Sequence, residues 1–152
     1  MLRRLAFAAA CVAFLVLSAA PSVAEPQFAT PEEAKALLEK AVAAVKDDKA
    51  KALEMFQTGE GGFKVKDLYV WCANASDGIL TAHPTNKGKD LRDIKGKQGA
   101  PFGEVIMQNA VEGTIKETTY WWPRPGSDEA FEKKALYTKA GDQVCGVGYY
   151  EE

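Results

Sequence analysis

The spacing of the apolar residues changes at Phe63, and this change restricts the possible folds more than any other feature of the sequence. Upstream of it, apolar residues recur at intervals of three and four, as on one face of an amphipathic helix. The residues of this stripe are Ala34, Leu37, Leu38, Ala41 and Val45. Downstream, short segments rich in β-branched and aromatic residues alternate with turn residues, which is typical of antiparallel strands. Helices that lead into a run of strands predict an α+β fold with an antiparallel sheet.

Two helical segments are expected before the change in spacing. Thr30 can cap the first helix, Pro31 suits its first position, and Glu33 completes a capping box. After the polar stretch 46–49, a second apolar group indicates another helix or a kinked continuation of the first. The residues of this group are Ala52, Leu53 and Phe56. Three glycines within residues 58–62 then favour a loop.

Five strands and one shorter helix are expected after the change in spacing. The strands are predicted at 67–73, 78–83, 114–122, 131–139 and 143–150. The Asp77-Gly78 pair is typical of the turn in a hairpin and joins the first two strands. The shorter helix lies between the second and third strands, and Gly113 is expected to end it. One face of this helix is predicted to carry Phe102, Val105, Ile106 and Asn109.

The N-terminus has the pattern of a secretory signal. Arg3 and Arg4 precede an uninterrupted run of sixteen small or apolar residues, 5–20, and a small residue stands at the cleavage position Ala24. We therefore expect residues 1–24 to be a cleaved signal peptide and residues 25–152 a single domain in the periplasm. An uncleaved anchor is the weaker alternative, because a membrane-spanning helix needs about twenty apolar residues. No second apolar run occurs, so neither a transmembrane relay nor a cytoplasmic output domain is expected.

Cleavage after Ala24 would leave two cysteines, Cys72 and Cys145. In an oxidising compartment an even number of cysteines favours a disulfide. Two separate buried thiols are the alternative, since free cysteine is among the most buried residue types.

Charge and composition exclude several classes of protein. Nineteen basic and 21 acidic residues give a net charge of −2, which argues against a nucleic-acid partner. A single histidine, His83, excludes a multi-histidine metal site, and no phosphate-binding, dinucleotide-binding or haem-attachment motif occurs. We therefore expect no enzyme, no cofactor and no metal. A hydrolase that uses His83 with Asp77 is the remaining alternative.

Six short stretches occur in a characteristic order at 67–71, 77–84, 88–91, 120–126, 134–137 and 146–150. They include Asp67-Leu-Tyr-Val-Trp, Asp77-Gly-Ile-Leu-Thr-Ala-His-Pro and Tyr120-Trp-Trp-Pro-Arg-Pro-Gly. With them the chain resembles the single Cache domains, the PAS-like extracytoplasmic sensor modules of bacterial chemoreceptors and kinases. The resemblance implies a long N-terminal helix on a five-stranded antiparallel sheet, a shorter connecting helix, and a small pocket for an organic molecule. The usual strand order of the family would also bring Cys72 close enough to Cys145 to form a disulfide.

Aromatic residues are the first candidates for the walls of this pocket. On the strand 114–122, Tyr120 and Trp122 face one side and Trp121 faces the other. One side must be core, and the other can line a ligand site, which is mostly apolar with a few polar groups. By the same alternation, Tyr69 and Trp71 share one face of the first strand.

Four further residues are candidates for polar contacts. His83 can donate a hydrogen bond to a carboxylate, or it can fix its loop through backbone bonds. Lys89 can attract an anion or be a solvated surface residue. Tyr137 and Lys134 lie on opposite faces of a regular strand, so both reach one pocket only if a bulge intervenes. Of these two, the Tyr137 hydroxyl is the preferred contact.

Two hypotheses about function follow. The first is a periplasmic sensory module that binds a small organic ligand, such as a short carboxylate. Its expected ligand-binding residues are Tyr69, Trp71, His83, Tyr120, Trp122, Lys134 and Tyr137. The second is an interaction module with a vestigial pocket that docks on a membrane receptor or sensor kinase. It is suggested because Cache domains usually lie between two transmembrane helices or ahead of a signalling domain, and neither is expected in this chain.

Overall fold

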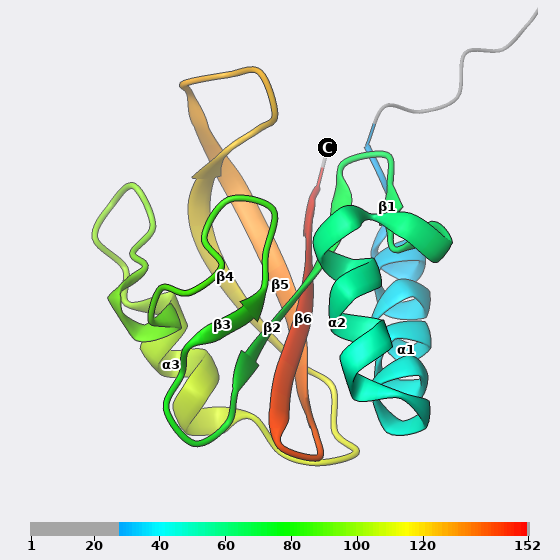
Figure 1. Ribbon diagram of the computed structural model, residues 1–152. Helices are drawn as coiled ribbons and strands as arrows, with labels where there is room; N and C mark the ends of the chain where they lie inside the picture. The colour runs from blue at the N-terminus through cyan, green and yellow to red at the C-terminus, as the bar shows by residue number, and fades with distance from the viewer. Residues whose placement is uncertain (1–27, 152) are drawn as a thin grey trace, which may run out of the picture.

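The computed structural model describes residues 28–151, and within them the fold is an antiparallel sheet between two helical layers (Figure 1). The expected signal peptide, residues 1–24, lies outside the described residues. Two helices stand on one face of the sheet, α1 (Pro31–Asp47) and α2 (Lys49–Thr58), and α3 (Phe102–Asn109) lies on the other face. The predicted α+β class is confirmed.

The strands are β1 (Lys64–Val65), β2 (Leu68–Asn74), β3 (Leu80–Ala82), β4 (Lys116–Pro123), β5 (Ala130–Ala140) and β6 (Gln143–Tyr150). The sheet has the order β1-β2-β6-β5-β4, and β3 also pairs with β2. All pairings between strands are antiparallel. Five of the six strands are the predicted ones. The sixth, β1, has only two residues and was not predicted, because so short a segment carries no periodic signal.

Local sequence signals explain how the first helices begin and end. The Thr30 hydroxyl accepts from Glu33 N–H and the Glu33 carboxylate accepts from Thr30 N–H, so the capping box is formed as predicted. Asp48 separates the two helices, because its extended backbone ends α1 while its carboxylate accepts from Lys51 N–H and caps α2. Gly59, with a φ of 81°, then ends α2 in the left-handed conformation that suits glycine.

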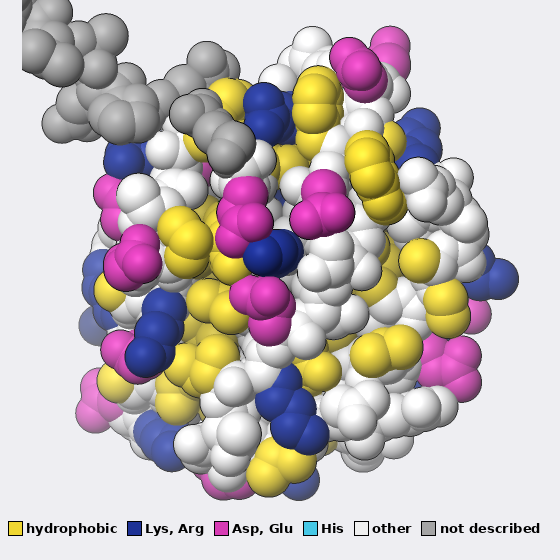
Figure 2. Space-filling model, turned by 180° about the vertical axis from the view of Figure 1, so that it is seen from behind, with side chains coloured by type: hydrophobic (Ala, Val, Ile, Leu, Met, Phe, Trp, Pro, Cys, Tyr) yellow, Lys and Arg dark blue, Asp and Glu magenta, His cyan; other side chains and the backbone are white. Residues whose placement is uncertain are grey.

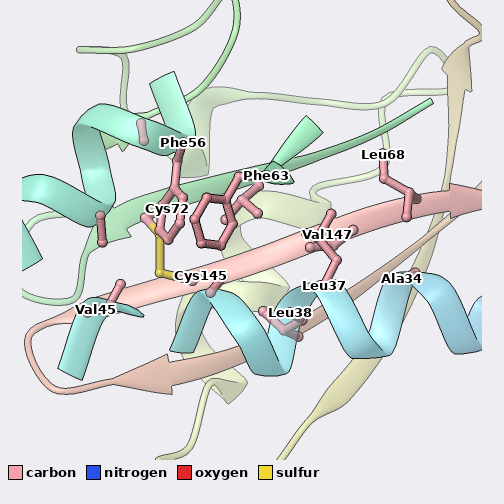
Figure 3. Packing of buried hydrophobic residues seen from close by; sticks show 14 of the residues in the cluster. Ala34, Leu37, Leu38, Val45, Phe56, Phe63, Leu68, Cys72, Cys145 and Val147 are labelled. Carbon is pink, nitrogen blue, oxygen red and sulfur yellow. A yellow bond between two sulfur atoms is a disulfide. The ribbon is translucent and has the colours of Figure 1, made fainter. Parts of the chain in front are cut away.

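The alternation of side chains along β2 and β6 creates two separate cores. On one face, the whole predicted stripe of α1 packs with Val70, Cys72, Cys145 and Val147 (Figure 3). On the other face, Trp71, Ala73 and Val144 pack with residues of α3 and with the 3-10 helix Leu91–Asp93. Each core therefore uses every second residue of the same two central strands.

A disulfide joins the two central strands on the face of α1 and α2. Cys72 and Cys145 are directly opposite each other in the β2–β6 register, with their Cα atoms 4.1 Å apart (Figure 3). Both residues are fully buried. The predicted disulfide is confirmed, and the alternative of two separate thiols is wrong.

Two expectations about side-chain direction are wrong. Val105 of α3 is 39% exposed and Asn109 is exposed, because the helix packs through Phe102, Gly103 and Ile106 instead. The helix also ends at Asn109, four residues before the expected Gly113. A helix of eight residues has only about two turns. So short an apolar pattern does not distinguish the true buried face from a face displaced by one position.

On β4, the side chain of Tyr120 faces the core, whereas the opposite face of the strand is open to solvent. Trp121 is 38% exposed there, since α1 packs on β5 and β6 but does not extend over β4. Seen from behind, the surface shows hydrophobic side chains interspersed with acidic and basic ones (Figure 2).

We predict that replacing both cysteines by alanine lowers the free energy of unfolding by about 4 kcal/mol, because the disulfide closes a loop over a sequence separation of 73. Urea unfolding of the oxidised protein and of the Cys72→Ala/Cys145→Ala variant measures the difference. The double variant removes both thiols, so no free cysteine complicates the comparison. Equal stabilities would show that the cross-link constrains the unfolded chain far less than its length implies.

Candidate functional site

Two neighbouring hollows lie on the sheet face opposite α1 and α2. The larger, here called the cleft, has a volume of about 180 Å³. Its lining residues are Tyr69, His83, Pro84, Thr85, Trp122, Pro123, Pro125, Lys133 and Tyr150. The smaller, here called the annex, has a volume of about 20 Å³, room for about one water molecule. Its lining residues are Tyr69, Trp71, His83, Leu91, Ile94, Phe102, Tyr120 and Trp122.

The two hollows share three side chains, Tyr69, His83 and Trp122. The two hollows therefore lie side by side, and a ligand in the cleft would contact residues that also line the annex.

Two glycines of β6 lie beneath side chains that line this region. Gly146 and Gly148 lie on the site face, and a Cβ atom at Gly146 would overlap the ring of Trp71. A Cβ atom at Gly148 would overlap the side chain of Lys133. The two glycines thus let a large ring and a long side chain lie flat across the central strand.

Among the described residues, Lys133 is the only cation that lines the cleft, and it is 2% exposed. It stands in one row across three strands, since Tyr120 is its partner on β4 and Tyr150 its partner on β6. Its Nζ lies 4.8 Å from the ring centroid of Tyr69 and 4.9 Å from that of Tyr150, so two aromatic faces stabilise the charge. Among residues 28–151, no acceptor bonds to this Nζ and no carboxylate forms a salt bridge with it.

Burial lowers the pKa of Lys133 from its usual value to about 8, and the more distant carboxylate of Asp67 partly opposes this shift. At neutral pH the side chain is still mostly an ammonium group. A buried ammonium without a counter-ion is an unfavourable arrangement, which an anion in the cleft would relieve.

The structure shows one of the two roles considered for His83, which is to fix its loop, and its contact with a ligand stays a prediction. Its Nδ1 accepts from the N–H groups of Thr85 and Asn86, each at 3.1 Å, and this fixes the loop after β3. Because Nδ1 is an acceptor, the neutral ring carries its proton on Nε2. The ring also lines both hollows. Gln57 of α2 further anchors the residue by bonding to its backbone N–H and C=O.

The pKa of His83 is lowered to about 4, first by desolvation and then by the positive charges of Lys133 and Lys89. The ring is therefore neutral throughout the physiological range and is a donor through Nε2 only.

Two tyrosine hydroxyl groups add further donors. Neither Tyr69 nor Tyr120 bonds through its hydroxyl to another side chain or backbone group of the described residues. Burial raises the pKa of Tyr69 to about 12 and that of Tyr120 well above its usual value, so both remain protonated. By contrast, the Tyr150 hydroxyl donates to the carbonyl of Pro123 at 2.6 Å and is already used within the fold.

The structure brings together five of the seven residues expected to bind a ligand: Tyr69, Trp71, His83, Tyr120 and Trp122. Tyr137 is buried in the same core but lines neither hollow. Lys134 lies on the opposite face of β5, where its Nζ bonds to Glu151 at 2.8 Å. No bulge interrupts the pairing of β5, so Lys134 cannot turn to the site face.

Lys133 was missed in the sequence. One signal could have identified it, because Lys133 precedes Ala135 and Tyr137 on the same face of the strand, and Tyr137 was already assigned to the pocket side.

Lys89 is exposed and its Nζ donates to Asn86 Oδ1. It lines a neighbouring surface groove that shares Ile94 and Trp122 with the annex.

The arrangement suits binding of an anion with few polar atoms. Its charged and polar groups are donors, and the remaining walls are aromatic or aliphatic.

Within residues 28–151, no cluster of three or more His, Cys, Asp or Glu side chains is placed to hold a metal ion. Among the same residues, no helix has the length and apolarity needed to cross a membrane.

Several solved structures are similar to the chain, among them the following three. A methyl-accepting chemotaxis protein from Vibrio parahaemolyticus aligns with a TM-score of 0.62 and 23% identity, over 78% of this chain and 86% of that one. A periplasmic sensor domain of a chemotaxis protein aligns with a TM-score of 0.54 and 24% identity, over 80% and 90% of the two chains. A Cache chemosensory domain described for carboxylic acid recognition aligns with a TM-score of 0.54 and 19% identity, over 80% and 88%.

At these identities the three likenesses establish the fold. A comparison with curated proteins finds no match. The family described as Single Cache domain 2 matches residues 19–152, which is most of the chain. The chain therefore belongs to the single Cache domain family.

Proposed function

We propose that this Cache domain is a periplasmic sensory module that binds a small organic acid, with the carboxylate of the ligand beside Lys133. The observation that carries the proposal is the buried ammonium of Lys133, which opens on the cleft and has no acidic partner within bonding distance among the described residues. A carboxylate there would gain charge-assisted hydrogen bonds and would remove the penalty of an unpaired buried charge.

The other donors at the site support the same ligand class. His83 offers Nε2–H from a ring that is fixed by its loop, and the hydroxyl groups of Tyr69 and Tyr120 are free to turn toward acceptors. Carboxylate oxygens accept several hydrogen bonds, whereas an amine ligand would offer only donors and a second positive charge. One of the structural neighbours is described for carboxylic acid recognition, in agreement with this proposal.

The absence of acidic side chains from the lining argues against cationic ligands. Within the part of the chain that the structure describes, neither the cleft nor the annex has an Asp or Glu among its lining residues. The volume of the cleft, about 180 Å³, also restricts the ligand to a small molecule.

We predict that Lys133→Met lowers the affinity for the organic acid by about tenfold to a hundredfold, the range for losing hydrogen bonds to a charged group. Isothermal titration calorimetry with acetate, propionate, pyruvate, lactate and succinate measures the effect. Lys134→Met is the matched control, because it removes the same charge from the neighbouring residue on the opposite face. If wild type binds none of these acids, or if the two variants weaken binding equally, the proposal is wrong.

The affinity should also depend on pH. The ligand binds the ammonium form of Lys133, whose pKa is about 8 in the free protein. Below this pH the affinity is expected to be constant, and above it the affinity should fall by about tenfold per pH unit. Titrations at pH 7, 8 and 9 in buffers of different ionisation enthalpy would measure both the affinity and the proton uptake. Binding that is unchanged from pH 7 to 9, without proton uptake, would exclude Lys133 as the counter-charge.

A neutral His83 predicts a specific loss of stability in acid. In the unfolded chain His83 takes up a proton near its usual pKa of 6.5, whereas in the fold its pKa is about 4. The unfolded state therefore binds more protons between these values, and the free energy of unfolding should fall by about 2 kcal/mol from pH 7 to pH 5. Urea unfolding at both pH values tests this. Because His83 is the only histidine, His83→Gln should remove most of the change, and an unaltered slope would refute the assignment.

A further inference from the structure

Phe102 lines the annex but not the cleft, where Lys133 lies. Its ring is stacked on that of Tyr120, with the centroids 3.9 Å apart and the planes at 7°. It also meets the ring of Trp122 edge to face at 6.0 Å. These contacts leave about 20 Å³ between the aromatic walls, so a group much larger than a methyl cannot enter while Phe102 holds this position.

The backbone fixes Phe102 where it stands. The next residue, Gly103, packs so closely on the 3-10 helix Leu91–Asp93 that a Cβ atom would overlap the carbonyl oxygen of Leu91. Ile106, one turn later, is fully buried in the same core. The start of α3 is therefore held against the 3-10 helix on one side and against the Tyr120 ring on the other.

The cleft and the annex impose different limits on a ligand. A carboxylate beside Lys133 would occupy the cleft, and the shared residues Tyr69 and His83 border both the cleft and the annex. An apolar chain that follows the carboxylate in this direction meets Phe102 after the annex is filled. We propose that Phe102 is a specificity-determining residue that limits the length of the apolar part of the ligand.

This inference rests on the proposed function, and one experiment separates the two. Calorimetric titrations with the unbranched series acetate, propionate, butyrate and hexanoate are made on wild type, Phe102→Ala and Val105→Ala. Val105 is on the exposed side of the same helix and serves as the matched control. Circular dichroism in the near ultraviolet shows whether each variant retains its packed aromatic residues.

Wild type and Val105→Ala are expected to bind the shortest acids best and to lose affinity from butyrate onward. Phe102→Ala should shift the preference toward longer chains, with affinity rising about fourfold for each methylene that becomes buried. The inference is overturned if wild type binds hexanoate as tightly as acetate, a result that requires no variant. It is also overturned if a folded Phe102→Ala protein keeps the chain-length preference of wild type.

If Phe102→Ala does not fold, Phe102→Leu supplies the test, because leucine fills more of the site but removes the planar ring. It should extend the preference by about one methylene. No binding of any acid by folded wild type would instead refute the proposed function, whereas binding without a Phe102 effect would refute only the size limit.

Discussion

The antiparallel pairing of β2 with β6 is the constraint on which the rest of the structure depends. This register sets Cys72 opposite Cys145 and Trp71 opposite Gly146, so neighbouring positions serve two different cores. On one face the disulfide and the apolar stripe of α1 close a dry interior. On the other face the same strands present glycines and aromatic rings, which pack into a second core that is hollowed at the candidate site. A shift of one residue would exchange these faces and put the cysteines into the site.

The structure carries an energetic cost at that hollow. A pKa lowered from 10.5 to about 8 means that holding Lys133 charged at neutral pH costs about 3 kcal/mol relative to water. Two tyrosine rings offset part of this cost through cation–π contacts. The core around α1 and the cross-link between β2 and β6 supply stability on the opposite face. The disulfide and this core thus lie on the face away from the candidate site.

Much of the fold could be predicted because its signals are local. The capping box at Thr30 and the apolar stripe of α1 are set by residues three and four apart, and the structure contains both as expected. The sequence correctly assigned Tyr120 and Trp121 to opposite sides of β4. Which side belongs to the core depends on how far α1 extends across the sheet, and local sequence does not determine this tertiary packing. The site was predicted in its aromatic part, since Tyr69 and Trp122 follow strand alternation. Its cation, Lys133, was missed, although alternation along β5 places Lys133 on the same face as Tyr137.

Those adjacent lysines show that burial and neighbours, not residue type, decide what a charge can do. Lys134 points to the solvent side of β5, where hydrogen bonding and charge attraction to Glu151 raise its pKa. Lys133 points into the cleft, and there desolvation lowers its pKa. The first charge is already neutralised by a carboxylate of the chain and screened by water, so an added anion gains little from it. The second has no such partner in the described fold, so an anion that reaches it meets a desolvated charge and a strong attraction.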